Sequence, residues 1–327
     1  MRRFIGFMLA MALAFGGLVF WWVNQPLNLA APTLDLSVEP GTAPRTVAQD
    51  SVTSGVQTSP TLLYWWFRLS GQARLIKAGS YELETGLTPR TLLAKLTRGE
   101  EVLRSVTLVE GWTFKQVRDA LLKAEHLAPD TKGLEANLIM KNMGKPSLHP
   151  EGRFYPDTYT YAKGSSDVKV LQRAMRAMDH QLAATWALRA PDSPLKSPDE
   201  LLTLASIVEK ETGRASDRPM VASVFTNRLR LGMMLQTDPT VIYGMGDKFD
   251  GNLRRRDLLA DTPWNTYTRT GLPPTPIAMP GKASLMAAVQ PATSNALYFV
   301  ARGDGTSQFS DNLDAHNNAV NKFQRGQ

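Results

Sequence analysis

The chain has 327 residues, of which 43% are hydrophobic and 20% are charged, as in an ordinary globular protein with a core. It has no cysteine and only four histidines, which excludes thiolate metal sites, disulfides and a cysteine nucleophile and argues against a histidine-based metal centre, so neither a metal nor another cofactor is expected. The formal net charge of +7 favours an anionic neighbourhood such as a membrane surface, but nucleic acid is not expected as a partner because the basic residues form no long arm.

The first predicted element is a membrane-spanning helix, Phe4–Val23. This run carries no charge, and as a helix it extends about 30 Å, the thickness of the bilayer hydrocarbon. Arg2 and Arg3 precede it, so the positive-inside rule predicts a cytoplasmic N-terminus. Trp21 and Trp22 end it, as in an interfacial aromatic belt. A cleaved signal peptide is the alternative, but no clear cleavage site follows. We therefore expect an uncleaved anchor through residues 4–23.

After a short connector, a strand–turn–helix pattern recurs three times. Each copy begins with an alternating segment that predicts a half-buried strand and ends in an amphipathic run that predicts a helix. The turns between them begin at Gly41, Gly86 and Gly111. Thr88 and Thr113 stand where a helix N-cap belongs. The apolar run 62–67 (LLYWWF) predicts a buried helix, the commoner outcome, or a membrane-surface contact.

Residues 131–150 contain two glycines and two prolines and are predicted to be an irregular connection. The segment EGRFYPDTY (151–159) then combines turn residues with aromatic side chains. Core packing is the preferred interpretation for Phe154, whereas Tyr159 suits stacking on a sugar face and core packing equally well. Asp157 is explained by capping of the next turn, without a catalytic role.

The helix predicted over 197–212 carries the main candidate residue. Ser197 and Glu200 have the spacing of a capping box, and Pro198 occupies the first helical position. Gly213 is a natural stop. Further helices are predicted over 168–188 and from about 216 to 232.

Glu209 lies at one margin of the apolar sector of this helix and Glu211 lies near the other margin. A carboxylate beside apolar side chains is partly desolvated, which disfavours its charged form and keeps a proton available, as a general acid requires. Most glutamates in a Glu-Lys-Glu run are solvated surface charges, however, so periodicity alone does not identify a catalytic residue.

Two polar loops follow. Gln236, Thr237 and Asp238 offer donors and acceptors of the kind that bind sugar hydroxyls and N-acetyl groups. An Asx-type turn into Pro239 is the alternative for Asp238. Asn265 and Tyr267, with the proline-rich segment that ends at residue 281, form a further candidate rim. The tail predicts a helix over 282–289, a strand over 297–300 and a closing helix over 312–323.

Four segments of the chain together resemble the YceG-like family of endolytic murein transglycosylases. They are ASIVEKE (205–211), VASVFTNRL (221–229), LQTDPTVIYG (235–244) and YTRTGLPPTPIAMPG (267–281). EGRFYPDTY is similar to the family's EG-x-x-x-PDTY motif. One departure is Ser307, which stands where the family usually has a histidine, so no role is assigned to that position.

The resemblance implies that Glu209 is the catalytic acid and base. In this family the glutamate protonates the oxygen between N-acetylmuramic acid and N-acetylglucosamine and then removes the proton of the C6 hydroxyl, which closes on C1 to give a 1,6-anhydro end. The internal hydroxyl has a high effective concentration, so the second carboxylate of an ordinary glycosidase is not needed. The implied partners are nascent glycan strands and peptidoglycan synthases, at the periplasmic face of the bacterial inner membrane.

The expected fold class is α+β. Residues 1–24 form the anchor, 25–130 a LysM-like region and 131–327 the catalytic domain. The LysM-like region is expected either to contact glycan or to act as a spacer. Two other functions remain open: a hydrolytic muramidase that uses Glu209 with Asp238 or Asp157, and a non-catalytic glycan-binding scaffold.

Overall fold

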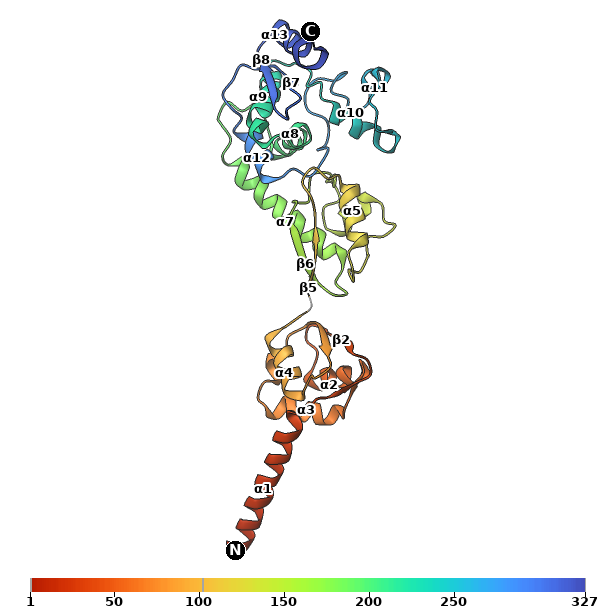
Figure 1. Ribbon diagram of the computed structural model, residues 1–327, viewed down its shortest axis with the longest axis vertical. Helices are drawn as coiled ribbons and strands as arrows, with labels where there is room; N and C mark the ends of the chain where they lie inside the picture. The colour runs from red at the N-terminus through yellow and green to blue at the C-terminus, as the bar shows by residue number, and fades with distance from the viewer. Residues whose placement is uncertain (1, 102, 327) are drawn as a thin grey trace. The chain divides into compact units, whose positions relative to one another are not determined.

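The computed structural model describes residues 2–101 and 103–326, and the side chains of Arg2 and Arg3 lie outside the described set. The orientation predicted from those two arginines is therefore not addressed by the structure. The chain forms two compact units (Figure 1). The first comprises residues up to Arg104 together with Thr160–Ser165, and the second comprises Ser105–Tyr159 and Ser166–Gln327.

The first unit begins with helix α1 (Arg2–Val23). Within the described residues, Phe4–Val23 is the one stretch long and apolar enough to cross a membrane. The end of α1 is fixed to the unit, because Val23 is buried and Trp22 packs against the core. The Asn24 side-chain amide donates to the Phe20 carbonyl at 2.7 Å and covers the last turn.

Two antiparallel sheets of two strands each, three α-helices and a short 3-10 helix complete the described part of the first unit. The elements are β1 (Asn28–Leu29), β2 (Thr33–Val38), α2 (Pro44–Thr53), β3 (Val56–Gln57), α3 (Pro60–Leu69), η1 (Ala73–Leu75), β4 (Gly79–Glu84) and α4 (Pro89–Arg98). Strand β2 pairs with β4 in a register that runs from Thr33 opposite Glu84 to Val38 opposite Gly79. Alternate residues of β2 are buried, as the period-two pattern predicts, because one side of the sheet packs against the core.

Helix α3 divides the apolar run between two environments. Leu63 and Phe67 are fully buried, as the core interpretation predicts. Leu62, Trp65 and Leu69 remain exposed. Core burial therefore accounts for one face of the helix only.

The second unit is built around α8. Its elements are β5 (Leu103–Thr107, which starts in the first unit), α5 (Phe114–Lys123), α6 (Ala136–Asn142), β6 (Thr158–Ala162), α7 (Asp167–Trp186), α8 (Pro198–Glu211), η2 (Ala215–Asp217), α9 (Arg218–Arg230), α10 (Asp238–Met245), η3 (Gly246–Lys248), α11 (Arg255–Leu259), α12 (Lys282–Val289), β7 (Tyr298–Ala301), β8 (Ser307–Ser310), α13 (Leu313–Val320) and a π-helical turn (Asn321–Arg325). Helices α7, α9 and α12 pack on α8 and enclose the main core. Strands β5 and β6 pair, and β7 pairs antiparallel with β8.

The mixed α+β class and the three strand–turn–helix copies are confirmed, as β2–α2, β4–α4 and β5–α5. Thr88 and Thr113 are the N-caps of α4 and α5. The third helix belongs to the second compact unit, so the expected region 25–130 does not coincide with the first unit.

Two local predictions were wrong. Residues 131–150 contain helix α6, which forms because Ile139 and Met140 are buried, although glycines and prolines lie on either side. The polar loop predicted at Gln236, Thr237 and Asp238 is shorter than expected, because helix α10 already begins at Asp238 with proline in its first turn.

Candidate active site

Glu209 lies in the last turn of α8, a helix that is buried on all sides. Residues 201–208 are all buried, so the predicted apolar sector was too narrow. The hydroxyl of Ser197 accepts a hydrogen bond from the Glu200 amide at 3.2 Å, as an N-cap should. The Glu200 carboxylate accepts from the Lys196 amide at 2.6 Å instead of returning to Ser197, so only half of the predicted capping box forms.

The Glu209 side chain is held in one orientation and is only 8% exposed. Its Oε2 accepts a hydrogen bond from the backbone N–H of Gly281 at 2.9 Å. Its Oε1 lies 3.8 Å from Nη2 of Arg218, the first residue of α9, whose side chain is 16% exposed. The candidate acid is therefore withdrawn from open solvent and fixed by contacts to two other segments.

A second carboxylate, Glu110, contacts the same glycine. A side-chain carbon placed on Gly281 would collide with Oε1 of Glu110, so this carboxylate lies against the Gly281 backbone. Burial raises the pKa of Glu110, the charge of Glu209 raises it further, and Arg218 opposes the shift. Two carboxylates thus meet at one backbone position.

Hydrogen bonds between two distant segments make this meeting possible. The Gly111 amide donates to the Met279 carbonyl at 2.8 Å, and the Met279 amide donates to the Trp112 carbonyl at 2.7 Å. Gly111 has a φ of 77°, a left-handed conformation that favours glycine. Glu110 was not predicted from the sequence, because Gly111 indicates only the start of a turn and no pattern marks the acid before it.

The first of the predicted polar loops contacts Glu211, the last residue of α8. The Thr237 hydroxyl donates to Glu211, and burial raises the pKa of Glu211. The Tyr267 hydroxyl donates to Oδ1 of Asp238 at 2.6 Å, which replaces the Asx-type turn considered for Asp238. Residues two apart lie about 200° around a helix, so these loops contact the Glu211 side of α8 and not the Glu209 contact set.

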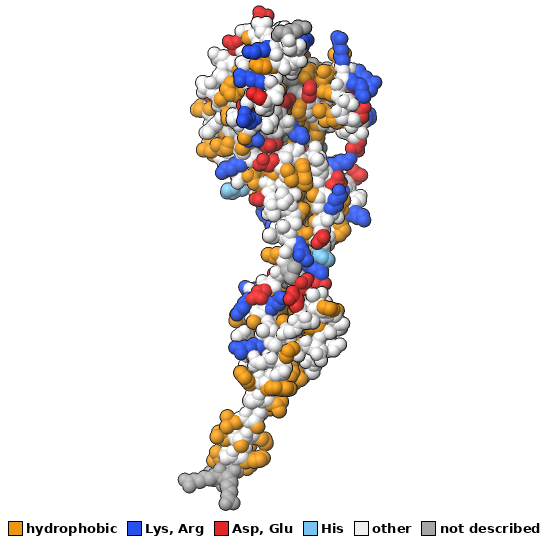
Figure 2. All heavy atoms as spheres, in the orientation of Figure 1, with side chains coloured by type: hydrophobic (Ala, Val, Ile, Leu, Met, Phe, Trp, Pro, Cys, Tyr) orange, Lys and Arg blue, Asp and Glu red, His pale blue; other side chains and the backbone are white. Residues whose placement is uncertain are grey.

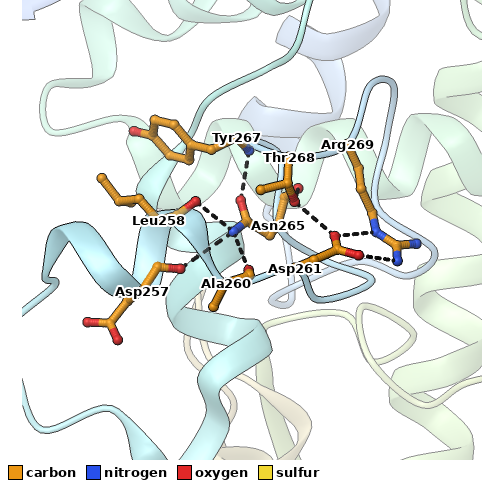
Figure 3. Close-up of polar contacts among 8 residues, drawn as sticks. All are labelled: Asp257, Leu258, Ala260, Asp261, Asn265, Tyr267, Thr268 and Arg269. Carbon is orange, nitrogen blue, oxygen red and sulfur yellow. Dashed lines mark hydrogen bonds and ion pairs between the residues drawn. The ribbon is translucent and has the colours of Figure 1, made fainter.

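Asn265 organises the second loop from the inside (Figure 3). It is fully buried, and its side-chain nitrogen donates to the carbonyls of Leu258 at 3.0 Å and Ala260 at 2.7 Å. Its side-chain oxygen accepts from the Tyr267 amide at 2.8 Å. The Asn265 side chain therefore positions Tyr267 and presents no free polar edge. Gln236 and Asp238 are exposed, whereas Thr237 is buried.

Tyr159 lies apart from these loops. Its side chain is buried, and its hydroxyl donates to the Tyr155 carbonyl at 2.7 Å. Phe154 is fully buried and stacks on Phe114, as the core interpretation predicts. Asp157 is exposed and accepts from the Thr158 amide at 2.7 Å. The pKa of Tyr155 is raised by its burial and then by the charge of Glu110. Tyr155 is therefore close enough to the carboxylate pair to interact with it electrostatically.

Glu151 is a buried carboxylate whose hydrogen bonds hold two helices together. It accepts from the Phe114 amide at 2.9 Å and from the Tyr243 hydroxyl at 3.1 Å, and so connects α5 with α10. Burial raises its pKa to about 7.

No group of three or more potential metal ligands is present among the described residues. A pocket of about 590 Å³ lined by Phe309, Lys322 and Phe323 does not include Glu209.

Comparison with known proteins gives concordant matches. A family model described as the YceG-like family matches residues 36–322. A Bacillus subtilis (strain 168) protein named endolytic murein transglycosylase is 30% identical over 308 residues, which cover 89% of this chain and 85% of that protein. A Streptococcus pneumoniae (strain D39) protein of the same name is 29% identical over 283 residues, which cover 75% of this chain but only 50% of that longer protein. A crystal structure of a YceG-like protein from Listeria monocytogenes superposes with a TM-score of 0.56 at 29% identity, and the match covers 88% of this chain and 98% of that one.

Proposed function

The chain belongs to the YceG-like family, and from this premise we propose that it is a peptidoglycan lytic transglycosylase that cuts glycan strands internally. Relatives that match most of the chain are named endolytic murein transglycosylases. One observation supports the assignment of the site. Glu209, in the ASIVEKE segment, has an enclosed carboxylate that accepts a hydrogen bond from the Gly281 amide.

Glu209 serves both halves of the proposed reaction. Protonated, it gives its proton to the bridging oxygen as the bond from that oxygen to C1 of N-acetylmuramic acid breaks. Ionised, it accepts the proton of the C6 hydroxyl, whose oxygen bonds to C1. The proton returns to Glu209, no water is consumed, and the products are a 1,6-anhydro end and a free N-acetylglucosamine hydroxyl. The intramolecular attack supplies the high effective concentration that replaces a second nucleophile.

The neighbours of Glu209 match this proton cycle. Like charges at close range disfavour ionisation of both members of a carboxyl pair, so Glu110 favours retention of a proton at the pair. The Gly281 amide and Arg218 stabilise the negative charge that forms once the proton has left. A neighbour that favours the proton-bearing pair and neighbours that stabilise the ionised carboxylate suit a residue that acts first as acid and then as base.

The exposed residues Gln236 and Asp238 and the half-buried Tyr267 are proposed to bind the glycan. Gln236, Asp238 and Tyr267 lie beside one another at the Glu211 side of α8. Thr237 and Asn265 are proposed to act indirectly, by holding the two loops together. Tyr159 is proposed only as support for the Tyr155 segment, because its side chain is buried.

The remaining parts of the proposal concern location. We propose that Phe4–Val23 is a single-pass anchor with a cytoplasmic N-terminus, which places both compact units on the periplasmic side of the inner membrane near newly made strands. Peptidoglycan synthases are the proposed partners. The small α+β first unit is proposed to be LysM-like, either as a glycan contact or as a spacer.

Digestion of purified sacculi by the full chain tests the activity. Glu209→Gln keeps the side-chain shape and lowers the rate by about 10²- to 10⁴-fold, the usual contribution of general acid–base catalysis. Glu200→Gln, the same exchange in the first turn of α8, is the matched control and keeps the wild-type rate. Mass analysis of the products should show anhydro ends. Reducing ends would indicate a hydrolytic muramidase, and loss of activity in Glu211→Gln but not in Glu209→Gln would assign the acid to Glu211. A folded Glu209→Gln protein with full activity would leave the catalytic assignment without support.

A further inference from the structure

Helix α3 of the first unit presents an apolar face that no described residue covers. Leu62, Trp65 and Leu69 recur at i, i+3 and i+7, and their exposed fractions are 51%, 49% and 72%. Leu75 in η1 is 60% exposed. A contiguous apolar row of this kind on a soluble surface usually marks an interaction site.

Helix α3 lies at the end of the unit from which α1 leaves (Figure 1). A groove of about 690 Å³ is lined on one side by α1, through Gly16 and Phe20, and on the other by Trp66 of α3 and by Arg90 and Arg98 of α4. Gly16 precedes Val23 by about 10 Å along the helix axis, at 1.5 Å per residue. Helices α3 and α4 therefore flank the last two turns of the apolar stretch. Figure 2 shows hydrophobic side chains along α1 and again on the adjoining end of the unit.

Basic side chains outnumber acidic ones in the same region, where Arg98 forms an ion pair with Glu100 at 3.4 Å. No aspartate or glutamate occurs between residues 51 and 81, a segment that contains Arg68, Arg74 and Lys77. Helix α4 also has no acid and contributes Arg90, Lys95 and Arg98. Tryptophan and leucine on one face with arginine and lysine at its border are typical of helices that lie in a membrane interface.

We propose that the first unit docks on the surface of the bilayer that α1 crosses, with the outer face of α3 among the lipid headgroups and its basic residues against anionic phospholipid phosphates. The inference rests on the proposed anchor, since α1 brings α3 to the bilayer. An apolar row at the depth of the last turns of a span would otherwise remain in water. Docking holds the first unit at one height and tilt, where a flexible tether would let it swing.

The absence of cysteine allows a direct test. Single cysteines are introduced into the full chain at Leu69 (outer face of α3), Leu13 (within α1) and Leu103. Leu103 is the matched control: it is an exposed leucine that lies outside α3 and α4 and is not among the residues that line the groove beside α1. Each variant carries a nitroxide and is reconstituted into vesicles with or without phosphatidylglycerol. Collision rates with oxygen and with a water-soluble nickel chelate report lipid and water exposure.

The proposal expects the label at 69 to resemble that at 13, with oxygen collisions enhanced and nickel collisions severalfold below those at 103. Arg90→Gln with Arg98→Gln should weaken this contrast in phosphatidylglycerol vesicles. Equal nickel access at 69 and 103 overturns docking. Protection of residue 69 from both reagents, or only when glycan strands are added, also overturns it by identifying a second copy or a sugar as the occupant.

Failure of the premise gives a different result. Water access at residue 13 would refute the anchor itself, whereas lipid access at 13 with water access at 69 refutes docking alone. Glycan cleavage is measured on the same preparations. Its loss together with the expected label pattern would leave docking intact and remove the enzymatic proposal.

Discussion

The substitution Gly281→Ala is expected to disturb the carboxylate pair while it leaves the fold intact. Gly281 has φ −81° and ψ 174°, an extended conformation that alanine adopts without strain. The added methyl group would collide with Oε1, Cδ and Cγ of Glu110, so the Glu110 carboxylate has to move. The Gly281 amide still reaches Glu209, and the hydrogen bond from Gly281 to Glu209 is therefore retained.

The two effects of this substitution differ in size. A displacement of about 1 Å at a reacting centre costs on the order of 10²-fold in rate, or about 2.7 kcal/mol of activation free energy. Alanine in place of glycine at the N-cap of α12 costs roughly 1 kcal/mol of stability or less. We therefore expect kcat/KM for strand cleavage to fall about a hundredfold while the urea midpoint changes little.

A double-mutant cycle with Glu110→Ala identifies the cause. If the methyl group acts through Glu110, adding Gly281→Ala to Glu110→Ala should cause little further loss. Activity of Gly281→Ala equal to that of the unchanged chain, or full additivity of the two losses, would refute the contact between Glu110 and Gly281.

Three further predictions follow from single side chains. Glu110→Gln should lower kcat, because it removes the carboxyl group that lies against Gly281 and whose own pKa is raised by burial and then by the charge of Glu209; an unchanged kcat would contradict a role for the proposed pair. Glu151 has a pKa raised by burial from about 4.5 to about 7, so the folded state retains this proton longer than the unfolded chain, and its contribution of about 3 kcal/mol is complete below pH 4.5 and lost as the pH rises through 7. Glu151→Gln should therefore flatten the change in urea midpoint between pH 5 and pH 7, and an identical slope in both proteins would argue against this origin. Asn265→Ala leaves buried carbonyls of the 257–260 turn without donors and should destabilise the protein by about 2–3 kcal/mol; calorimetry that finds a loss below about 0.5 kcal/mol would show that the amide is dispensable.

Local patterns in the sequence determined several elements of this protein. The uncharged run Phe4–Val23 predicts the helix α1 because its length and composition are sufficient by themselves. The cap and proline at Ser197 and Pro198 predict where α8 begins. The apolar neighbours of Glu209 predict a withdrawn carboxylate, and its side chain is 8% exposed.

Contacts between distant segments were decided only by the tertiary structure. Glu110 meets Gly281 because the backbone at Gly111 and Trp112 pairs with Met279, and no local pattern encodes that pairing. Asn265 suits a sugar-binding rim by its chemistry, yet the fold uses its amide to bind backbone carbonyls. Helix α3 is apolar on both faces, and packing chose which face the core covers. The physical reason is that periodicity reports which side chains share a face of one element, whereas the segment that covers this face depends on how the whole chain packs.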